Sequence, residues 1–129
     1  MLEHIKNFDV FRNCNADLLN EVVKNIRIRD EKAGITILNQ GDDSKSLYLI
    51  LDGTLLVTQL AIDGKIVSLE LSKKGHCFGE IAIIDGSPRS ASVISLTDVK
   101  LGILPEKFVN ETLMSDKVFL KSLLLRFAG

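Results

Sequence analysis

Hydrophobic and polar positions near the start of the chain follow the period of a helix. Apolar residues recur there at the spacing of one helical face, namely Leu18, Leu19, Val22, Val23 and Ile26. Asn15 directly precedes them, and asparagine is a residue that caps helix N-termini through its side-chain oxygen. The pattern predicts an amphipathic helix over residues 16–26.

A different pattern fills the middle of the chain. Glycines recur at intervals of 7 to 12 residues, at Gly34, Gly41, Gly53, Gly64, Gly75 and Gly86. Between them lie short runs rich in β-branched and apolar residues: "ITIL", "SLYLIL", "TLLVTQL", "KIVSLEL" and "SASVISL". In the fourth run Val67, Leu69 and Leu71 alternate with Ser68 and Glu70, as in a strand.

These runs predict a series of hairpins. Asp52-Gly53 and Asp63-Gly64 are dipeptides that two-residue hairpin turns favour, because both central residues then need positive φ. Many short strands with regular turns are typical of a barrel or a jelly roll. We therefore expect a mainly β fold, an antiparallel β-roll resembling a jelly-roll barrel, with an N-terminal helix and two C-terminal helices.

Helical spacing returns after the last strand. Pro105 suits the first turn of a helix that contains Phe108, Val109 and Leu113, and a second helix is expected from about Asp116. That second helix carries apolar residues on more than one face: Val118, Phe119, Leu120, Leu123, Leu124, Leu125 and Phe127. Such a helix needs a packing partner. Its own barrel, a dimer seam and a lid over a ligand all remain open.

Composition limits the classes of function. A chain of 129 residues fits one domain, 1–129, with a helix at 16–26, a roll at 27–104 and helices at 105–127. Sixteen Lys and Arg against seventeen Asp and Glu give a net charge of -1 without blocks of like charge, so we expect no direct binding to nucleic acid or membrane.

The same data favour a cytoplasmic protein. The N-terminal "MLEHIKNF" has charges where a signal peptide needs its apolar run, and no apolar segment approaches the length that spans a bilayer. Cys14 and Cys77 lack CxxC spacing, so we expect reduced thiols that pack as small hydrophobic residues.

The stretch "FGEIAIIDGSPRSASV", residues 78–93, concentrates the candidate chemistry. Gly79 permits close backbone approach to a ligand, and the next residues can form a short helix whose first N–H groups attract an anion. Arg89 returns over that helix end after the "DGSP" turn, and a guanidinium suits a phosphate. Glu80 would be repelled by a phosphate unless a sugar hydroxyl met it, which indicates a nucleotide. A surface salt bridge between Glu80 and Arg89 is the open alternative.

The same stretch resembles the phosphate-binding cassette of the cyclic-nucleotide-binding domain family, found in catabolite activator proteins and in regulatory subunits of cyclic-AMP-dependent protein kinase. Its Phe-Gly-Glu, Ala, Pro-Arg, Ala and Val elements are all present. The resemblance extends to "LNQGDDSKSLYLILDGTLLV", residues 38–57, and to "LPEKFVNETLMSD".

The resemblance implies a role for each matching residue. Glu80 would bind the ribose 2'-hydroxyl and Arg89 the exocyclic phosphate oxygens. The backbone N–H groups of Ile81, Ala82 and Ser90 would complete the phosphate site, with Gly79 giving close approach. Further candidate contacts come from the cassette and from looser matches in the strands: Phe78, Ala91, Val57 and Leu69, the last two as apolar walls beside the base.

Base identity and the lid depend on other positions. The Ser90 hydroxyl is compatible with cyclic AMP, which is favoured over cyclic GMP. Family members cap the base with a residue of the last helix, and Leu124, Arg126 and Phe127 are the candidates here, with no motif selecting among them. We expect a non-enzymatic sensor whose C-terminal helices move on binding. The last helix is a candidate homodimer interface. The sequence does not identify the downstream effector protein.

Two rival classes of function share the fold. A cupin-like barrel enzyme needs several converging His and carboxylate ligands, whereas the chain has only His4 and His76. A docking or dimerisation module that binds no nucleotide has no need of both Glu80 and Arg89. Both features favour ligand binding over catalysis or docking alone.

Overall fold

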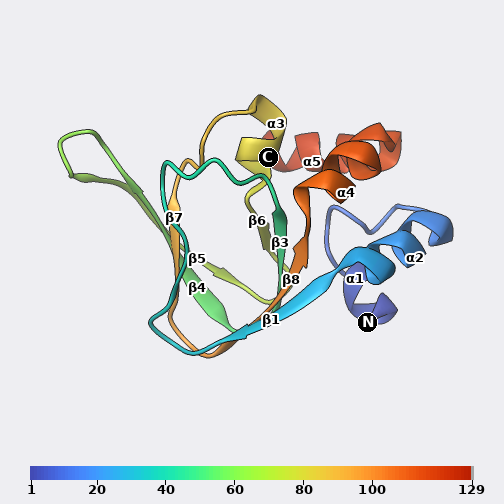
Figure 1. Cartoon of the computed structure of the whole chain (residues 1–129), viewed down its shortest axis with the longest axis horizontal. Helices are drawn as coiled ribbons and strands as arrows, with labels where there is room; N and C mark the ends of the chain where they lie inside the picture. Colours follow the sequence, from blue (N-terminus) through green and yellow to red (C-terminus); the bar gives the residue numbers. More distant parts are fainter. Residues whose placement is uncertain (129) are drawn as a thin grey trace.

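The computed structural model describes residues 1–128, apart from the side chains of Ile81, Arg126, Phe127 and Ala128. Two antiparallel sheets of four strands form the described fold, in the orders β1-β8-β3-β6 and β2-β7-β4-β5 (Figure 1). The predicted mainly β roll with flanking helices is confirmed, and the sheets form a roll rather than a closed barrel. The strands are β1 (Arg27–Glu31), β2 (Thr36–Leu38), β3 (Leu47–Asp52), β4 (Thr54–Leu60), β5 (Ile66–Lys73), β6 (Cys77–Phe78), β7 (Ser92–Ser95) and β8 (Val99–Leu104).

Most helices gather on the side of the first sheet (Figure 1). They are α1 (Leu2–Lys6), α2 (Ala16–Asn25), α3 (Glu80–Asp85), α4 (Glu106–Glu111), the 3-10 helix η1 (Leu113–Ser115) and α5 (Lys117–Ala128). The expected Asn15 cap is present, since its side chain accepts from the Leu18 N–H at 2.9 Å. Pro105 occupies the N-cap of α4 rather than its first turn. Helix α1, which the sequence pattern did not predict, buries Ile5.

The apolar core has two parts. One lies between the helices and the first sheet, where the buried rings of Phe11 and Phe119 approach to 5.3 Å between centroids. The other lies between the two sheets and includes Leu55, Val93 and Tyr48. Helix α5 therefore packs on its own domain through Phe119, while other apolar side chains of the helix remain exposed, at Val118, Leu124 and Leu125.

The two Asp-Gly dipeptides do not form the predicted two-residue hairpin turns. Asp52 and Gly53 join strands of different sheets, because β3 pairs with β8 whereas β4 pairs with β5 and β7. Gly53 has φ 95°, and a Cβ there would lie 2.5 Å from the Asp98 carbonyl oxygen. Asp63 and Gly64 do lie in the β4–β5 hairpin, but its loop spans residues 61–65, and only Gly64 has positive φ.

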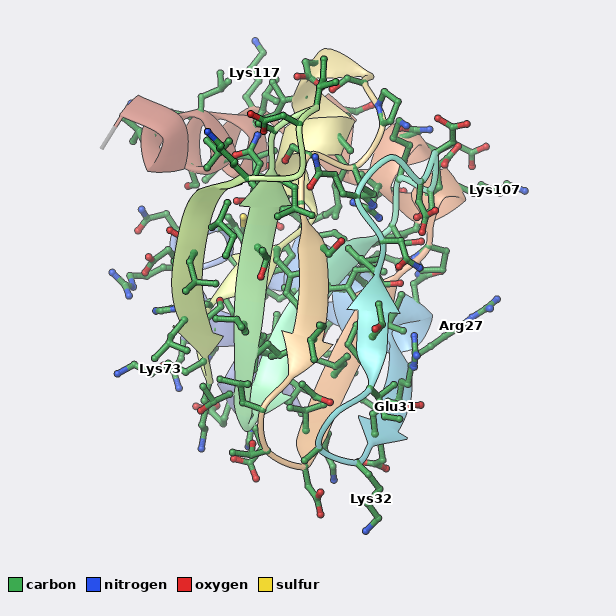
Figure 2. The ribbon with its side chains drawn as sticks, turned by 90° about the vertical axis from the view of Figure 1, so that its left-hand side faces the viewer. Arg27, Glu31, Lys32, Lys73, Lys107 and Lys117 are labelled. Atoms are coloured by element: carbon green, nitrogen blue, oxygen red, sulfur yellow. The ribbon has the colours of Figure 1, made fainter. Side chains whose placement is uncertain are left out.

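Strand β5 has the predicted alternation, with its apolar side chains facing away from the core. Leu69 and Leu71 are 57% and 63% exposed, and Val67 is also exposed. The opposite face carries Ser68, Glu70 and Ser72, which line a cavity that Leu71 also borders. Figure 2 views the second sheet from outside and shows Lys73 pointing away at the end of β5.

Both cysteines are free. Burial raises the pKa of the Cys14 thiol to about 11, and the nearby Asp116 carboxylate adds to this effect because it disfavours a second negative charge. Over the residues that the structure describes, no helix is long and apolar enough to cross a membrane.

Candidate functional site

A cavity of about 500 Å³ lies between α3 and the inner face of the second sheet. Most of the predicted site residues line it: Val57, Phe78, Gly79, Glu80, Ala82, Arg89, Ser90 and Ala91. Leu69 does not, because strand alternation directs it to the outer face. Ile81 lies in the first turn of α3, where its backbone N–H has no partner within the helix, and its side chain is outside the described part of the chain.

Gly79 makes the sharp entry into α3. Its φ of 93° belongs to the left-handed region, which a residue without Cβ adopts at little cost. A Cβ would also lie 2.6 Å from the Arg89 Nη1 and 3.0 Å from the Ser46 carbonyl oxygen. Gly79 is therefore required both by the backbone turn and by the guanidinium beside it.

The exit from α3 is held by local hydrogen bonds. Gly86 caps the helix at φ 71° and donates to the Ala82 carbonyl at 3.0 Å. Ser87 then donates to the exposed Asp85 carboxylate from its backbone N–H and from its hydroxyl, and these bonds hold the pKa of Asp85 below its usual value. The turn brings Arg89 back toward the start of the helix.

Arg89 is only 3% exposed and is held by hydrogen bonds to the backbone. Nη1 donates to the Gly79 carbonyl at 2.9 Å, Nη2 to the Ser46 carbonyl at 2.8 Å, and Nε to Ser44 Oγ at 3.3 Å. Its guanidinium carbon lies 5.8 Å from the centre of the Tyr48 ring, which stacks on Phe78.

The electrostatics of Arg89 fit an anion site. Burial lowers the pKa of the guanidinium, and nearby Tyr48, Asp42 and Glu80 partly offset that effect. Each terminal nitrogen carries a second N–H, so the group can donate further toward the cavity. An arginine that only forms a surface salt bridge would be exposed. The burial of Arg89 therefore disfavours the alternative of a surface salt bridge with Glu80.

The loop between β2 and β3 joins the Arg89 segment to the β4–β5 hairpin. Arg89 donates its backbone N–H to the Asp42 carbonyl at 2.6 Å, and Gly41 donates to the Arg89 carbonyl at 2.8 Å. Beside them the Gln40 side chain donates to the Leu60 carbonyl at 2.8 Å and accepts from the Leu60 N–H at 2.9 Å. The Gln40 side-chain amide thus makes the same two hydrogen bonds to the Leu60 backbone that a residue of a neighbouring strand would make.

The sequence reasoning missed a polar wall of the cavity. Gln59 on β4 and Ser68, Glu70 and Ser72 on β5 line it, and so does His76. The His76 Nδ1 accepts from the Lys73 N–H at 3.3 Å. The alternation of Ser68 and Glu70 in "KIVSLEL" was the available signal. Across the described residues, no group of three His, Cys, Asp or Glu side chains is arranged to hold a metal ion.

The family model of the cyclic nucleotide-binding domain matches residues 29–116. The chain therefore belongs to the cyclic nucleotide-binding domain family. It is 38% identical over 72 residues to a cAMP-dependent protein kinase regulatory subunit of Aspergillus niger, an alignment that covers 56% of this chain and 17% of the relative. It is 36% identical over 101 residues to the bovine (Bos taurus) cyclic nucleotide-gated channel alpha-2, covering 74% of this chain and 15% of the relative.

Solved structures agree on the fold. The regulatory domain of Toxoplasma gondii PKA, crystallised with cAMP, superposes with a TM-score of 0.78 at 27% identity, covering 84% of this chain and 41% of that one. The catabolite activator protein of Thermus thermophilus gives 0.81 at 23% identity, covering 93% and 56%. The chain thus spans less than a fifth of the length of the two curated relatives and about half of these structures.

Proposed function

We propose that this domain binds a cyclic nucleoside monophosphate, with cyclic AMP favoured over cyclic GMP, and acts as a regulatory sensor rather than an enzyme. The observation that carries the proposal is the buried, backbone-anchored Arg89 beside Gly79 at one end of the cavity. A buried guanidinium with donors to spare needs an anionic partner, and the cavity has room for one. The relatives named for cAMP and for cyclic nucleotides support the choice of ligand class.

The proposed contacts follow from the two charged side chains. Arg89 meets the phosphate oxygens, and the N–H groups of Ile81, Ala82 and Ser90 complete that end of the site. The Glu80 carboxylate, half-buried in the first turn of α3, accepts from the ribose 2'-hydroxyl. Val57 packs beside the base. This arrangement gives the neighbouring Glu80 and Arg89 separate partners on one ligand.

The readout we propose is a change in helix packing. Phosphate binding draws α3 toward Arg89, and the helices that pack against the same core, α4 and α5, adjust their positions. Ile83 and Ile84 of α3 pack against the cluster that contains Phe108 and Phe119, so a path for this adjustment exists. The ligand shifts the population only if its affinity differs between the two helix positions.

Calorimetric titration with cyclic AMP and with cyclic GMP tests the proposal. Refolded protein, from which any carried ligand has been removed by denaturation, should release heat with both nucleotides and bind cyclic AMP more tightly. Heat with neither nucleotide would contradict the function and favour the docking module. Tighter binding of cyclic GMP would reverse only the preference.

Arg89→Lys tests the assigned phosphate end. Lysine keeps the charge but cannot donate in parallel from a planar fork, so binding of cyclic AMP should weaken by about 2 kcal/mol. The control is Arg27→Lys, because Arg27 points away from the molecule on β1 (Figure 2). Equal affinities of the two folded variants, with folding checked by circular dichroism, would show that Arg89 does not bind the phosphate.

A further inference from the structure

The cavity lining contains another charged residue, Glu70, to which the proposed function assigns no ligand contact. Glu70 of β5 lines the cavity together with Gln59 and Ser68, all on the inner face of the second sheet. We infer that Glu70 determines base specificity by accepting a hydrogen bond from an exocyclic amino group of the base. This inference rests on the proposed function, since it assumes a nucleotide whose phosphate lies at Arg89.

Strand register places Glu70 at the opposite end from the phosphate. Val57 of β4 pairs with Glu70 on one side and with Val93 of β7 on the other, so the three residues form one row. All three line the cavity. Neighbouring strands lie about 4.8 Å apart, so the β5 backbone is roughly 10 Å from β7, next to which Ser90 and Ala91 lie. A base that packs on Val57 therefore points its far edge toward Glu70.

Hydrogen bonds fix the separation of the two ends. Strand β5 is paired with β4 from Thr54 and Lys73 at one end to Leu60 and Ile66 at the other. The Gln40 side chain ties Leu60 to the loop that also bonds the Arg89 backbone. Glu70 therefore stands on a wall whose distance from Arg89 is set by paired backbone rather than by a free loop.

The chemistry of a carboxylate decides which base edge it accepts. A glutamate carboxylate has acceptors only, so the Glu70 side chain pairs with an N–H group and repels a carbonyl oxygen. At position 6 adenine carries an amino group where hypoxanthine carries an oxygen, whereas hypoxanthine has its N–H at the neighbouring N1. The inference therefore places the Glu70 carboxylate at position 6 of the base. Because Glu70 lines the cavity but is exposed, we expect discrimination of about tenfold rather than the larger factors of a closed polar pocket.

Titrations with cyclic AMP and cyclic inosine monophosphate test the inference. The unsubstituted domain should bind cyclic AMP about tenfold more tightly. Glu70→Gln should bring the ratio close to one, because the amide can donate to the hypoxanthine oxygen as well as accept from adenine. The matched control is Glu111→Gln, an exposed position at the end of α4 outside the cavity lining, which should keep the parent ratio.

The outcomes separate this inference from the proposed function. If both nucleotides bind and Glu70→Gln leaves the ratio unchanged, the domain is a cyclic nucleotide binder and the role of Glu70 is overturned. If the parent protein binds neither nucleotide, the proposed function fails and the inference with it. A ratio that collapses in Glu70→Gln alone, with melting temperature unchanged, supports the specificity role.

Discussion

The space around the Arg89 guanidinium depends on a missing side chain at Gly79. The Gly79 carbonyl accepts from Arg89 Nη1, and a Cβ on the same residue would lie 2.6 Å from that nitrogen. Arg89 cannot easily move aside, since Ser46 and Ser44 hold its other nitrogens. The buried arginine and the glycine therefore form one structural unit.

Gly79→Ala should weaken ligand binding more than its backbone strain alone would. A left-handed alanine costs about 1–2 kcal/mol of folding free energy, and the added Cβ must also displace the guanidinium. We expect at least a tenfold loss of cyclic AMP affinity in titration calorimetry. Gly34→Ala is the control, because its φ is 85° and nothing lies within 4 Å of the added Cβ. Equal losses of affinity in both variants would contradict the role of this contact.

At the scale of elements, the Gln40 side-chain amide connects the β2–β3 loop, which bonds the Arg89 backbone, to the β4–β5 hairpin. Gln40→Ala should remove both hydrogen bonds to Leu60, each contributing about 1 kcal/mol or less at this exposed site. The expected result is faster hydrogen exchange of the Leu60 amide, with a small change in global stability. Asn39→Ala is the control, since Asn39 bonds Asp42 through its backbone N–H. Unchanged exchange at Leu60 would contradict the connection.

For strand β5, the sequence pattern predicts the strand but not which of its faces turns inward. Alternation of Val67, Leu69 and Leu71 gives the strand and its period, but period alone does not say which face turns inward. Here the polar face turns inward and lines the cavity, whereas a rule that buries apolar residues gives the opposite answer. Leu69, for which the sequence predicted a base contact, therefore lies on the face opposite Glu70 and outside the cavity lining.

The Asp52-Gly53 turn and the segment of residues 78–93 differ in whether local sequence determines their structure. Asp52-Gly53 has the composition of a hairpin turn, yet a neighbouring backbone at Asp98, distant in sequence, explains its glycine. The residues 78–93 were predictable together because glycine, arginine and the short helix constrain one another locally. The Gln40 contact with Leu60 joins residues far apart along the chain, and no local pattern indicates it.

At the scale of the whole molecule, the two ends of the chain share one core. Phe11, from the N-terminal segment, contacts Phe119 of α5, and the cluster around them includes Val22 of α2 and Leu104 of β8. Residues of α3 pack against the same cluster. Helices from both termini therefore pack on the same cluster as α3, the helix beside the cavity.

Phe119→Ala should destabilise the entire domain. The side chain is fully buried, and removing a buried phenylalanine ring costs about 3–5 kcal/mol, a large part of a small domain's stability. Val118→Ala on the same helix changes a side chain that is 44% exposed, so it should cost no more than about 1 kcal/mol. Urea denaturation measures both, and adding cyclic AMP should recover part of the Phe119→Ala loss, because a ligand that binds only the folded state stabilises it. If Phe119→Ala costs no more than Val118→Ala, the helices of the two termini do not share the core described above.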